Sequence, residues 1–410
     1  MPALALRGGI PVRAEPFPAW PVCDGREERA LIETLRSGVW GIPRPRVEEF
    51  EARFAAYCDA RYATACTSGS TALILAIVAC GIGAGDEVIV PPYTFIATAT
   101  SVFMANAVPV FADIDPNTFN LDPAAVEAAI TPRTKAIVPV HLGGCPCDMD
   151  GIMDVARKHG LRVIEDACQA HGAEWKGQKV GAIGDLGCFS FQSSKNLTCG
   201  EGGAVTSNDE ALAAAVDSIY NVGRLPGKGF HEHFGLGTNF RMNEFQAALL
   251  LCGLERLPEQ TALRNRNGAL LRELLSGIPA IAMQISDPRV TAHAWHLFPF
   301  RYKKEQCKGV PREKFLAALK AEGIPCVAGY TPLYRAPLFQ NARFGAHGCP
   351  AACPFREGKA DYSTVHLPVV EQVCGEMLWL QQRILLGAED DMRDIAKAIA
   401  KVVEHADDLL

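Results

Sequence analysis

Five short apolar runs, separated by stretches with a helical pattern, constrain the fold of this 410-residue chain more than any other feature. The runs are apolar throughout and do not alternate with polar residues, as is typical of strands buried on both faces. Such strands between helices predict a mainly parallel sheet in a three-layer α/β domain. The predicted strands are residues 87–92, 108–114, 135–142, 161–167 and 186–191, with helices at 123–130 and 149–159 among them.

The pattern changes near residue 255. A long helix is expected first, interrupted at Pro258, because proline removes a helical hydrogen bond. A second, smaller α/β unit follows, and a last helix begins after Gly387 with three acidic residues in its first turn. The predicted elements are the long helix 244–272, a strand at 294–302 and a helix at 312–322. The predicted domains are an N-terminal segment 1–28, a large domain 29–258 and a small C-terminal domain 259–410.

Composition places the chain among ordinary globular proteins. Apolar residues make up 49% and charged residues 21%, with a net charge of -6, which argues against nucleic acid or an anionic membrane as partner. The longest apolar stretch, 72–80, is too short to span a bilayer, and the first residues lack a signal-peptide pattern, so we expect a cytoplasmic protein. Fifteen cysteines without paired zinc-site spacing predict reduced thiols and no structural metal.

In parallel sheets, ligands bind at the carboxyl ends of the strands. Three groups of residues follow strands or open a helix at such positions. The segment TSGSTAL starts an apolar helix, with Ser68 as N-cap and free N–H groups expected at Ser70 and Thr71 to hold a phosphate. Asp166 closes the strand LRVIE, and Lys195 follows the strand CFSF. A phosphate cradle, an acid and a lysine at one sheet edge call for a ligand with three matching groups.

Pyridoxal phosphate has these three groups. Its phosphate suits a helix N-terminus, its ring nitrogen suits a carboxylate, and its aldehyde forms a Schiff base with lysine. The aromatic stretch that contains Phe95 follows another strand and offers a ring to stack on the cofactor. The residues therefore predict a pyridoxal phosphate enzyme.

Long ordered motifs give the chain a resemblance to the sugar aminotransferases of the DegT/DnrJ/StrS family. The resemblance implies the pyridoxal-phosphate-dependent transferase type I fold of aspartate aminotransferase and a homodimer with shared active sites. It extends over nearly the whole chain and rests on GDEVIVPPYTFIATA, TPRTKAIVPVH, VIEDACQAHGA, FSFQSSKNLTCGEGGA, NFRMNEFQAA, HAWHLFPFR and YTPLYRAPLF.

The family resemblance also implies roles for single residues. Lys195 would form the Schiff base, Asp166 would pair with the ring nitrogen, and Gln169 would bond the phenolate oxygen of the ring. Phe95 would stack on the ring. The implied phosphate ligands are Ser70, Thr71 and Ser190, with Asn239 reaching the phosphate of the neighbouring subunit.

The implied activity is amino transfer from L-glutamate or L-glutamine to a keto sugar, often nucleotide-linked, or to a keto cyclitol, in antibiotic or cell-surface sugar biosynthesis. The segments GGIPVR, FHEHFGLGTNFRMNE and WLQQRILLGAEDDM resemble the cyclitol and aminohydroxybenzoate branch. Dehydratase members carry histidine in place of the lysine, so Lys195 favours transamination.

Three other functions stay open at this stage. They are a pyridoxal phosphate dehydratase or lyase, such as an aminohydroxybenzoate synthase-type aromatisation, a non-catalytic ligand-sensing regulator, and a nicotinamide enzyme. The last would use GIGAGDE (81–87), but its spacing and its place between a helix and a strand are typical of a helix stop and turn.

Polar residues for the acceptor are expected at the mouth of the cleft. A glycine-rich stretch, 223–237, is a candidate substrate loop, and HEH within it has no third metal ligand at a suitable spacing. The candidates are Arg224, Lys228, His231 and His233 in this loop, and Tyr330, Tyr334 and His296 in the small domain.

Overall fold

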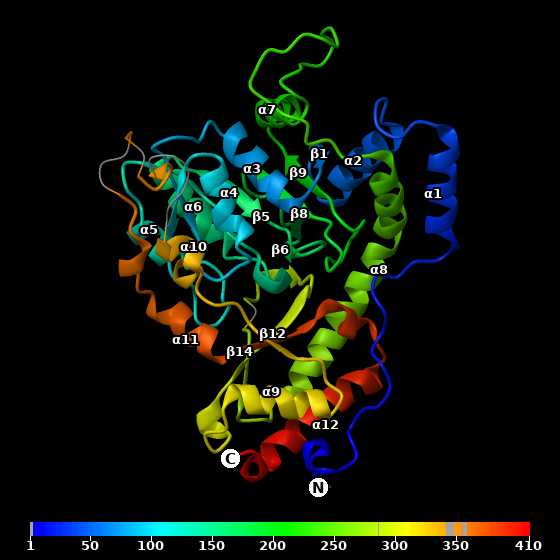
Figure 1. Ribbon diagram of the computed structural model, residues 1–410, viewed down its shortest axis with the longest axis vertical. Helices are drawn as coiled ribbons and strands as arrows, with labels where there is room; N and C mark the ends of the chain where they lie inside the picture. Colours follow the sequence, from blue (N-terminus) through cyan, green and yellow to red (C-terminus); the bar gives the residue numbers. More distant parts are fainter. Residues whose placement is uncertain (1–2, 286, 342–347, 353, 356–358) are drawn as a thin grey trace.

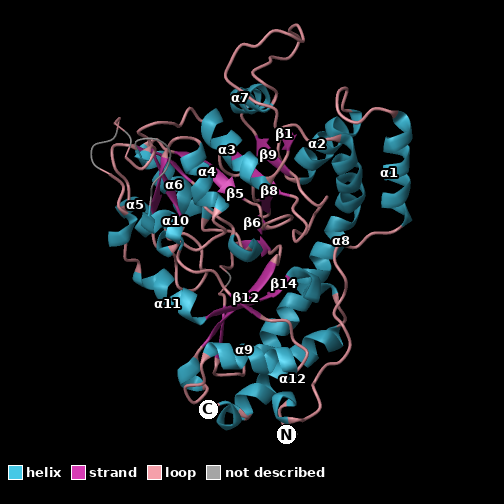
Figure 2. Cartoon of the chain, viewed as in Figure 1, coloured by secondary structure: helices cyan, strands magenta, loops and turns pink. Residues whose placement is uncertain are grey.

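The larger unit of the protein is built around a seven-stranded sheet (Figures 1 and 2). The computed structural model describes residues 3–285, 287–341, 348–352, 354–355 and 359–410. The strand order of this sheet is β1-β9-β8-β5-β4-β2-β3, with parallel pairing from β3 through β8 and antiparallel pairing of β9 with β8 and β1. The strands are β1 Tyr62–Cys66, β2 Glu87–Val90, β3 Val108–Phe111, β4 Thr134–Ile137, β5 Arg162–Asp166, β8 Leu186–Ser190 and β9 Gly203–Ser207.

Helices cover both faces of this sheet, as the apolar runs predict. In β2, Val88 and Val90 belong to one hydrophobic cluster and Ile89 to the other, so each face of the strand is buried. The first face is covered by α3 (Gly69–Ala79), α4 (Ala97–Met104) and α7 (Glu210–Tyr220). The second is covered by α2 (Pro45–Tyr57), α5 (Pro123–Ala128), α6 (Met149–His159) and the first half of α8 (Glu244–Leu275).

All five predicted strands are present, and each is shorter than predicted. The strand expected over 87–92 ends at Val90, because Pro91 and Pro92 have no N–H to donate to a neighbouring strand. The segment GIGAGDE lies between α3 and β2, and Gly81 there has a φ of +73°. The interpretation of this segment as a helix stop and turn is confirmed.

The break predicted at Pro258 is wrong, because α8 continues through this residue to Leu275. Pro258 is exposed, while Leu254 and Leu257 beside it bury the neighbouring side of the helix. Packing of that buried side holds the helix together across the missing hydrogen bond. The domain boundary predicted at 258 therefore lies inside a continuous helix, which runs from the large sheet to the small one (Figure 1).

A second sheet of four antiparallel strands has the order β10-β12-β14-β13. The strand predicted to start at 294 starts at Leu297, because Ala294 donates its N–H to Gly144 and Trp295 has a φ of +51°. The strands are β10 Ile281–Met283, β12 Leu297–Tyr302, β13 Val327–Ala328 and β14 Met377–Gln381, and the main covering helices are α9 (Arg312–Ala321) and α12 (Glu389–Glu404).

The remaining elements are short or peripheral. Helix α1 (Gly25–Ser37) begins at a capping box formed by Asp24 and Glu27 and packs along α8. A three-stranded ribbon is formed by β11 (Val290–Ala292), β6 (Glu174–Trp175) and β7 (Gln178–Lys179). Two further helices are α10 (Pro337–Asn341) and α11 (Pro368–Glu376). Among the helices described, none combines the length and the apolarity that crossing a membrane requires.

The N-terminal segment packs on the small sheet and then runs beside α8 towards α1 (Figure 1). Leu4 is fully buried in the core of the small sheet. The carboxylate of Glu322 accepts hydrogen bonds from the N–H groups of Ala5 and Val12 and forms a buried ion pair with Lys401, at 2.9 Å. The start of the chain is therefore part of the small-sheet unit.

Candidate active site

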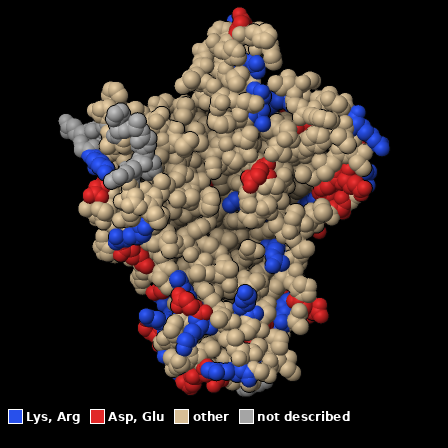
Figure 3. All heavy atoms as spheres, in the orientation of Figure 1, with Lys and Arg blue, Asp and Glu red and all other residues tan. Residues whose placement is uncertain are grey.

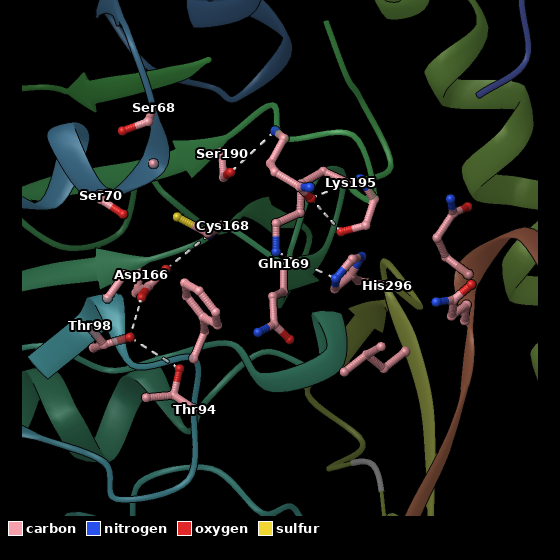
Figure 4. Close-up of a pocket in the computed structure, with 18 of the residues that line it drawn as sticks. Ser68, Ser70, Thr94, Thr98, Asp166, Cys168, Gln169, Ser190, Lys195 and His296 are labelled. Carbon is pink, nitrogen blue, oxygen red and sulfur yellow. Dashed lines mark hydrogen bonds between the residues drawn. The ribbon is translucent and has the colours of Figure 1, made fainter. Parts of the chain in front are cut away.

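A cavity of about 540 Å³ lies where the carboxyl ends of β5 and β8 face the small sheet (Figure 4). Six of the eight predicted cofactor-binding residues line it, contributed by separate segments of the large-sheet unit. They are Ser70, Phe95, Asp166, Gln169, Ser190 and Lys195. The residues of the predicted phosphate cradle, acid and lysine are thus brought to one place.

Lys195 extends into this cavity from the turn that follows β8. Its backbone N–H donates to the carbonyl of Gln192, which closes the turn, and its Nζ lies 3.5 Å from Nε2 of His296. Burial lowers the pKa of the amine, while Cys168 and Asp166 act in the opposite direction. A lysine with a lowered pKa is available as an unprotonated base nearer to neutral pH.

Asp166 is the last residue of β5, and its carboxylate is buried in the cavity wall. Its Oδ2 accepts a hydrogen bond from Oγ1 of Thr98 at 2.8 Å, and its Oδ1 accepts one from the N–H of Cys168 at 3.2 Å. Thr98 is in turn linked to Thr94 (Figure 4). These contacts fix the orientation of the carboxylate.

The N-terminus of α3 forms the opposite wall. Gly69 is in close contact with the end of β8, because a Cβ atom on it would lie 2.6 Å from Cβ of Ser190. This close packing places the hydroxyl groups of Ser70 and Ser190 on the cavity lining beside the positive end of the helix. Such an N-terminus is a suitable anion site.

The expectation of a free N–H at Thr71 is wrong. This N–H donates to Oγ of Ser68, at 3.1 Å, and the hydroxyl group of Thr71 also contacts the hydroxyls of Ser68 and Thr67. Thr71 is buried and does not line the cavity. The side-chain cap that defines the helix start therefore uses the donor that was assigned to the phosphate.

The side chain of Gln169 is oriented by its neighbours. Its Oε1 accepts a hydrogen bond from the N–H of Gly143 at 2.8 Å, which leaves the amide NH₂ as the donor of this side chain. Tyr330 contacts Gln169, and burial raises the pKa of its hydroxyl to about 12. Phe95 is 56% exposed at the cavity wall, where its ring is available for stacking.

Several candidate residues lie elsewhere. Asn239 is exposed and outside the lining. Tyr334 is fully buried and donates to Glu371. The loop 223–237 projects from the top of the molecule beyond α7 (Figure 1), so the structure does not bring Arg224, Lys228, His231 or His233 to this cavity. Tyr330 and His296 do line it, as predicted.

Some residues of the cavity had no predicted role. Thr98 lies on α4, within the motif GDEVIVPPYTFIATA, which assigned no role to it. Trp20 comes from the N-terminal segment and donates its indole N–H to the carbonyl of Ser193, two residues before the lysine. The other missed lining residues include Glu201, Trp379, Gln381, Gln382 and Arg383. These five residues lie within motifs quoted for the family resemblance, but no role was assigned to them, because only the tertiary fold brings them to the cavity.

The donor set suits pyridoxal phosphate. A lysine amine, a hydrogen-bonded carboxylate, two serine hydroxyls and a helix N-terminus surround one cavity, and each matches a different group of that cofactor. Within the described ranges, no group of three or more potential metal ligands is present. The cysteines described are free thiols, and burial raises the pKa of Cys168 well above its usual range.

Comparison with known proteins agrees with this geometry. The model of the DegT/DnrJ/EryC1/StrS aminotransferase family matches residues 21–399. The L-glutamine:2-deoxy-scyllo-inosose aminotransferase of Streptoalloteichus tenebrarius is 41% identical over 425 residues, which cover 99% of each chain.

Two solved structures are also similar. The crystal structure of 3-amino-5-hydroxybenzoic acid synthase has a TM-score of 0.86 and 35% identity, covering 96% of this chain and 100% of the other. The structure of ntda from Bacillus subtilis with bound PMP has a TM-score of 0.79 and 28% identity, covering 93% of this chain and 82% of the other. These matches confirm the family, the fold class and the cyclitol and aminohydroxybenzoate branch.

Proposed function

Because this chain belongs to the DegT/DnrJ/EryC1/StrS aminotransferase family, we propose that it transfers the amino group of L-glutamine to the ketone of a cyclitol of the 2-deoxy-scyllo-inosose class. The chain is an aminotransferase by family. Full-length relatives named for this reaction support the donor and the acceptor class. The main structural support for the proposal is that the amine of Lys195 lies in the same cavity as the fixed carboxylate of Asp166.

Pyridoxal 5′-phosphate is the proposed cofactor. When bound, it supplies an aldehyde that condenses with amines and a cationic ring that withdraws electrons from the carbon losing its proton. Asp166 would hold the proton on the ring nitrogen, and Gln169 would donate to the ring oxygen. The hydroxyls of Ser70 and Ser190 and the start of α3 would hold the phosphate, with Phe95 against the ring. Thr71 would support this cradle through Ser68.

Lys195 has two tasks in this proposal. Its amine would hold the cofactor covalently, and the same amine, once free, would take up and return the proton that moves during amino transfer. Burial lowers its pKa, which favours the unprotonated amine that the first step requires. Leu297, Trp379 and Tyr330 line the same cavity and form an apolar and aromatic part of its wall.

The charge of the cavity favours an uncharged acceptor. Among the described lining residues, the positive side chains are Lys195 and Arg383, and the guanidinium of Arg383 already donates to the carbonyl of Pro18. A nucleotide-linked sugar would bring a pyrophosphate that requires further cations. A cyclitol ketone needs hydrogen bonds and ring contacts instead of cations. On the described part of the face shown in Figure 3, acidic and basic side chains are interspersed in the lower half.

A homodimer with shared active sites remains part of the proposal. Asn239 is exposed beside the loop 223–237, in a position where it is free to contact a second copy. Its proposed role is to reach the phosphate of that copy. We also propose a cytoplasmic location, and domains of 29–258 and 259–410 after an N-terminal segment of 1–28.

Borohydride reduction and half-reaction assays test the function. Protein supplied with cofactor is reduced and digested, and a phosphopyridoxyl adduct is expected on the peptide that contains Lys195. Separately, L-glutamine should convert the cofactor to its amine form, and 2-deoxy-scyllo-inosose should restore the original absorbance with formation of an aminocyclitol. Absence of the adduct, or of restoration by any cyclitol ketone, would overturn the proposal.

The same assay separates the alternative activity. Similarity to 3-amino-5-hydroxybenzoic acid synthase keeps aromatisation by a dehydratase as the second candidate. Amino transfer yields one keto acid from the donor for each aminated product, whereas dehydration yields an unsaturated or aromatic product with no donor consumed. Product analysis by mass spectrometry distinguishes the two.

A further inference from the structure

His296 is the residue of the small-sheet unit that contacts the amine of Lys195 (Figure 4). It is 7% exposed and directly precedes β12, while the lysine belongs to the turn after β8. The carbonyl of His296 accepts a hydrogen bond from the N–H of Gln382, at 3.1 Å, which anchors its backbone to the end of β14. The backbone of His296 is thus tied to the segment that follows β14.

The hydrogen bonds around His296 define which of its nitrogens carries the proton. The amide NH₂ of Asn196 donates to the carbonyl of Ala294 at 2.6 Å, so its Oδ1 faces Nδ1 of His296, at 3.4 Å. An amide oxygen only accepts, so Nδ1 must donate. In the neutral ring, Nε2 is then without a proton and faces Nζ of Lys195 as an acceptor.

The charges around the ring keep it neutral. Burial lowers the pKa of His296 well below its usual range, and Lys195, His171 and Arg264 act in the same direction. His171 is itself buried, with its pKa lowered to about 3. The titratable groups that affect His296 are therefore cations or another buried imidazole, and they favour the neutral form of its ring.

We propose that His296 is a positioning residue for Lys195, whose amine donates a hydrogen bond to the bare Nε2 and is thereby aimed at the cavity. The inference rests on the proposed role of this lysine in amino transfer. A free amine has two N–H bonds and one lone pair. When one N–H is held by His296, rotation about the last side-chain bond is restricted, and the lone pair is directed towards the bound substrate.

The same contact serves the protonated lysine. After the amine has taken a proton, the ammonium group donates to Nε2, so the acceptor stabilises the state from which the proton is returned. No proton passes to the imidazole in this scheme. His296 therefore acts through Lys195, and the effect of losing it should be measured on the lysine.

Competitive labelling of the cofactor-free protein measures that effect. The rate at which acetic anhydride modifies Lys195, followed by mass spectrometry of its peptide as a function of pH, gives the pKa of the amine. Replacement His296→Phe keeps an aromatic ring but removes the acceptor. We expect the midpoint of the labelling curve, and with it the pKa of the amine, to fall by about one pH unit. At a fixed pH below the midpoint, Lys195 should then be labelled about tenfold faster.

Two further variants keep the test specific. His296→Gln offers an amide oxygen near the position of Nε2 and should return the midpoint close to that of the original protein. His293→Phe removes another buried imidazole from the same segment, one that stacks on Trp295 and makes no hydrogen bond to the lysine. It should leave the midpoint unchanged.

The outcomes separate this inference from the proposed function. An unchanged midpoint in His296→Phe, an equal shift in His296→Gln, or an equal shift in His293→Phe would each overturn it. The labelling uses protein without cofactor and gives the same answer whether or not amino groups are transferred. Failure to trap the cofactor on Lys195 would overturn the function and leave the labelling result standing.

Discussion

The Nζ atom of Lys195 lies 3.5 Å from Nε2 of His296, although 101 residues separate them in the sequence. The lysine follows a strand of the large sheet, and the histidine precedes a strand of the small one. The reactive amine is therefore in contact with both halves of the molecule.

Replacing Lys195 with alanine should abolish amino transfer. The amine is both the covalent anchor and the proton carrier, and general acid–base catalysis alone is worth about 10²- to 10⁴-fold in rate. The measurement is steady-state turnover with L-glutamine and a cyclitol ketone. Lys228→Ala, in the exposed loop, is the matched control and should keep full activity. Turnover of Lys195→Ala at the original rate would refute the mechanism.

Replacing Thr98 with valine should weaken catalysis through Asp166. The variant keeps the shape of the side chain but removes the hydrogen bond to Oδ2 of the carboxylate. Hydrogen bonds to charged groups contribute about 1.5–3 kcal/mol, so kcat should fall about tenfold or more. Thr100→Val, on the same helix and bonded only to the carbonyl of Ile96 in the hydrogen bonds described, should have little effect. Equal losses in the two variants would show that Asp166 is not the target.

The cofactor-free protein should become more stable when Lys195 is replaced by methionine. Burial lowers the pKa of the folded lysine below the usual 10.5, so folding is opposed by the ammonium form. Between the two pKa values the unfolded chain binds more protons, and the free energy of unfolding rises with pH. Thermal unfolding should therefore show a higher midpoint for Lys195→Met at neutral pH, with a difference that shrinks as the pH approaches the usual lysine pKa. A difference independent of pH would contradict this.

Replacing Pro258 with alanine should stabilise the fold. The residue is exposed within a continuous helix, and proline in a helix interior costs about 3 kcal/mol relative to alanine. Restoring the N–H should raise the free energy of unfolding by about 1–3 kcal/mol in urea titrations. Glu259→Ala, also exposed, should change it by less than about 0.5 kcal/mol. A loss of stability would show that the proline is required to shape the helix.

Replacing Glu322 with glutamine should release the N-terminal segment. The variant leaves Lys401 as a buried charge without its carboxylate, which typically costs about 3–5 kcal/mol. Urea titration should show that loss, and limited proteolysis should cut before residue 20 sooner than in the original protein. Glu305→Gln, at an exposed site, is the control. If cleavage rates are equal, the ion pair does not hold the segment.

Sequence patterns predicted the parts of the site that are local. Lys195 and Asp166 were identifiable because each follows a buried strand, and strand ends meet at one edge of a parallel sheet. Thr98 and Trp20 were not identifiable, because their contacts depend on how α4 and the N-terminal segment pack. Pro258 was misjudged for the same kind of reason, since tertiary packing overrides a local preference.

The capping interaction at α3 shows a further limit. Ser68 was correctly identified as the N-cap, but a side chain that caps a helix occupies one of the N–H groups that would otherwise bind a ligand. Local pattern alone did not show that these two uses compete at Thr71. The predicted phosphate site therefore depends on the side chains of Ser70 and Ser190 as well as on the N-terminus of the helix.

The attachment of the first residues to Glu322 and Lys401 has a consequence for synthesis on the ribosome. Leu4 is made before the other residues of its core, most of which lie between Leu271 and Leu409 and are made much later. The large sheet can form while this leading segment is still unattached, since domains generally fold in the order in which they are made. The indole of Trp20 reaches Ser193 only after the segment is docked, so a nascent chain would complete its catalytic pocket as one of its last folding events.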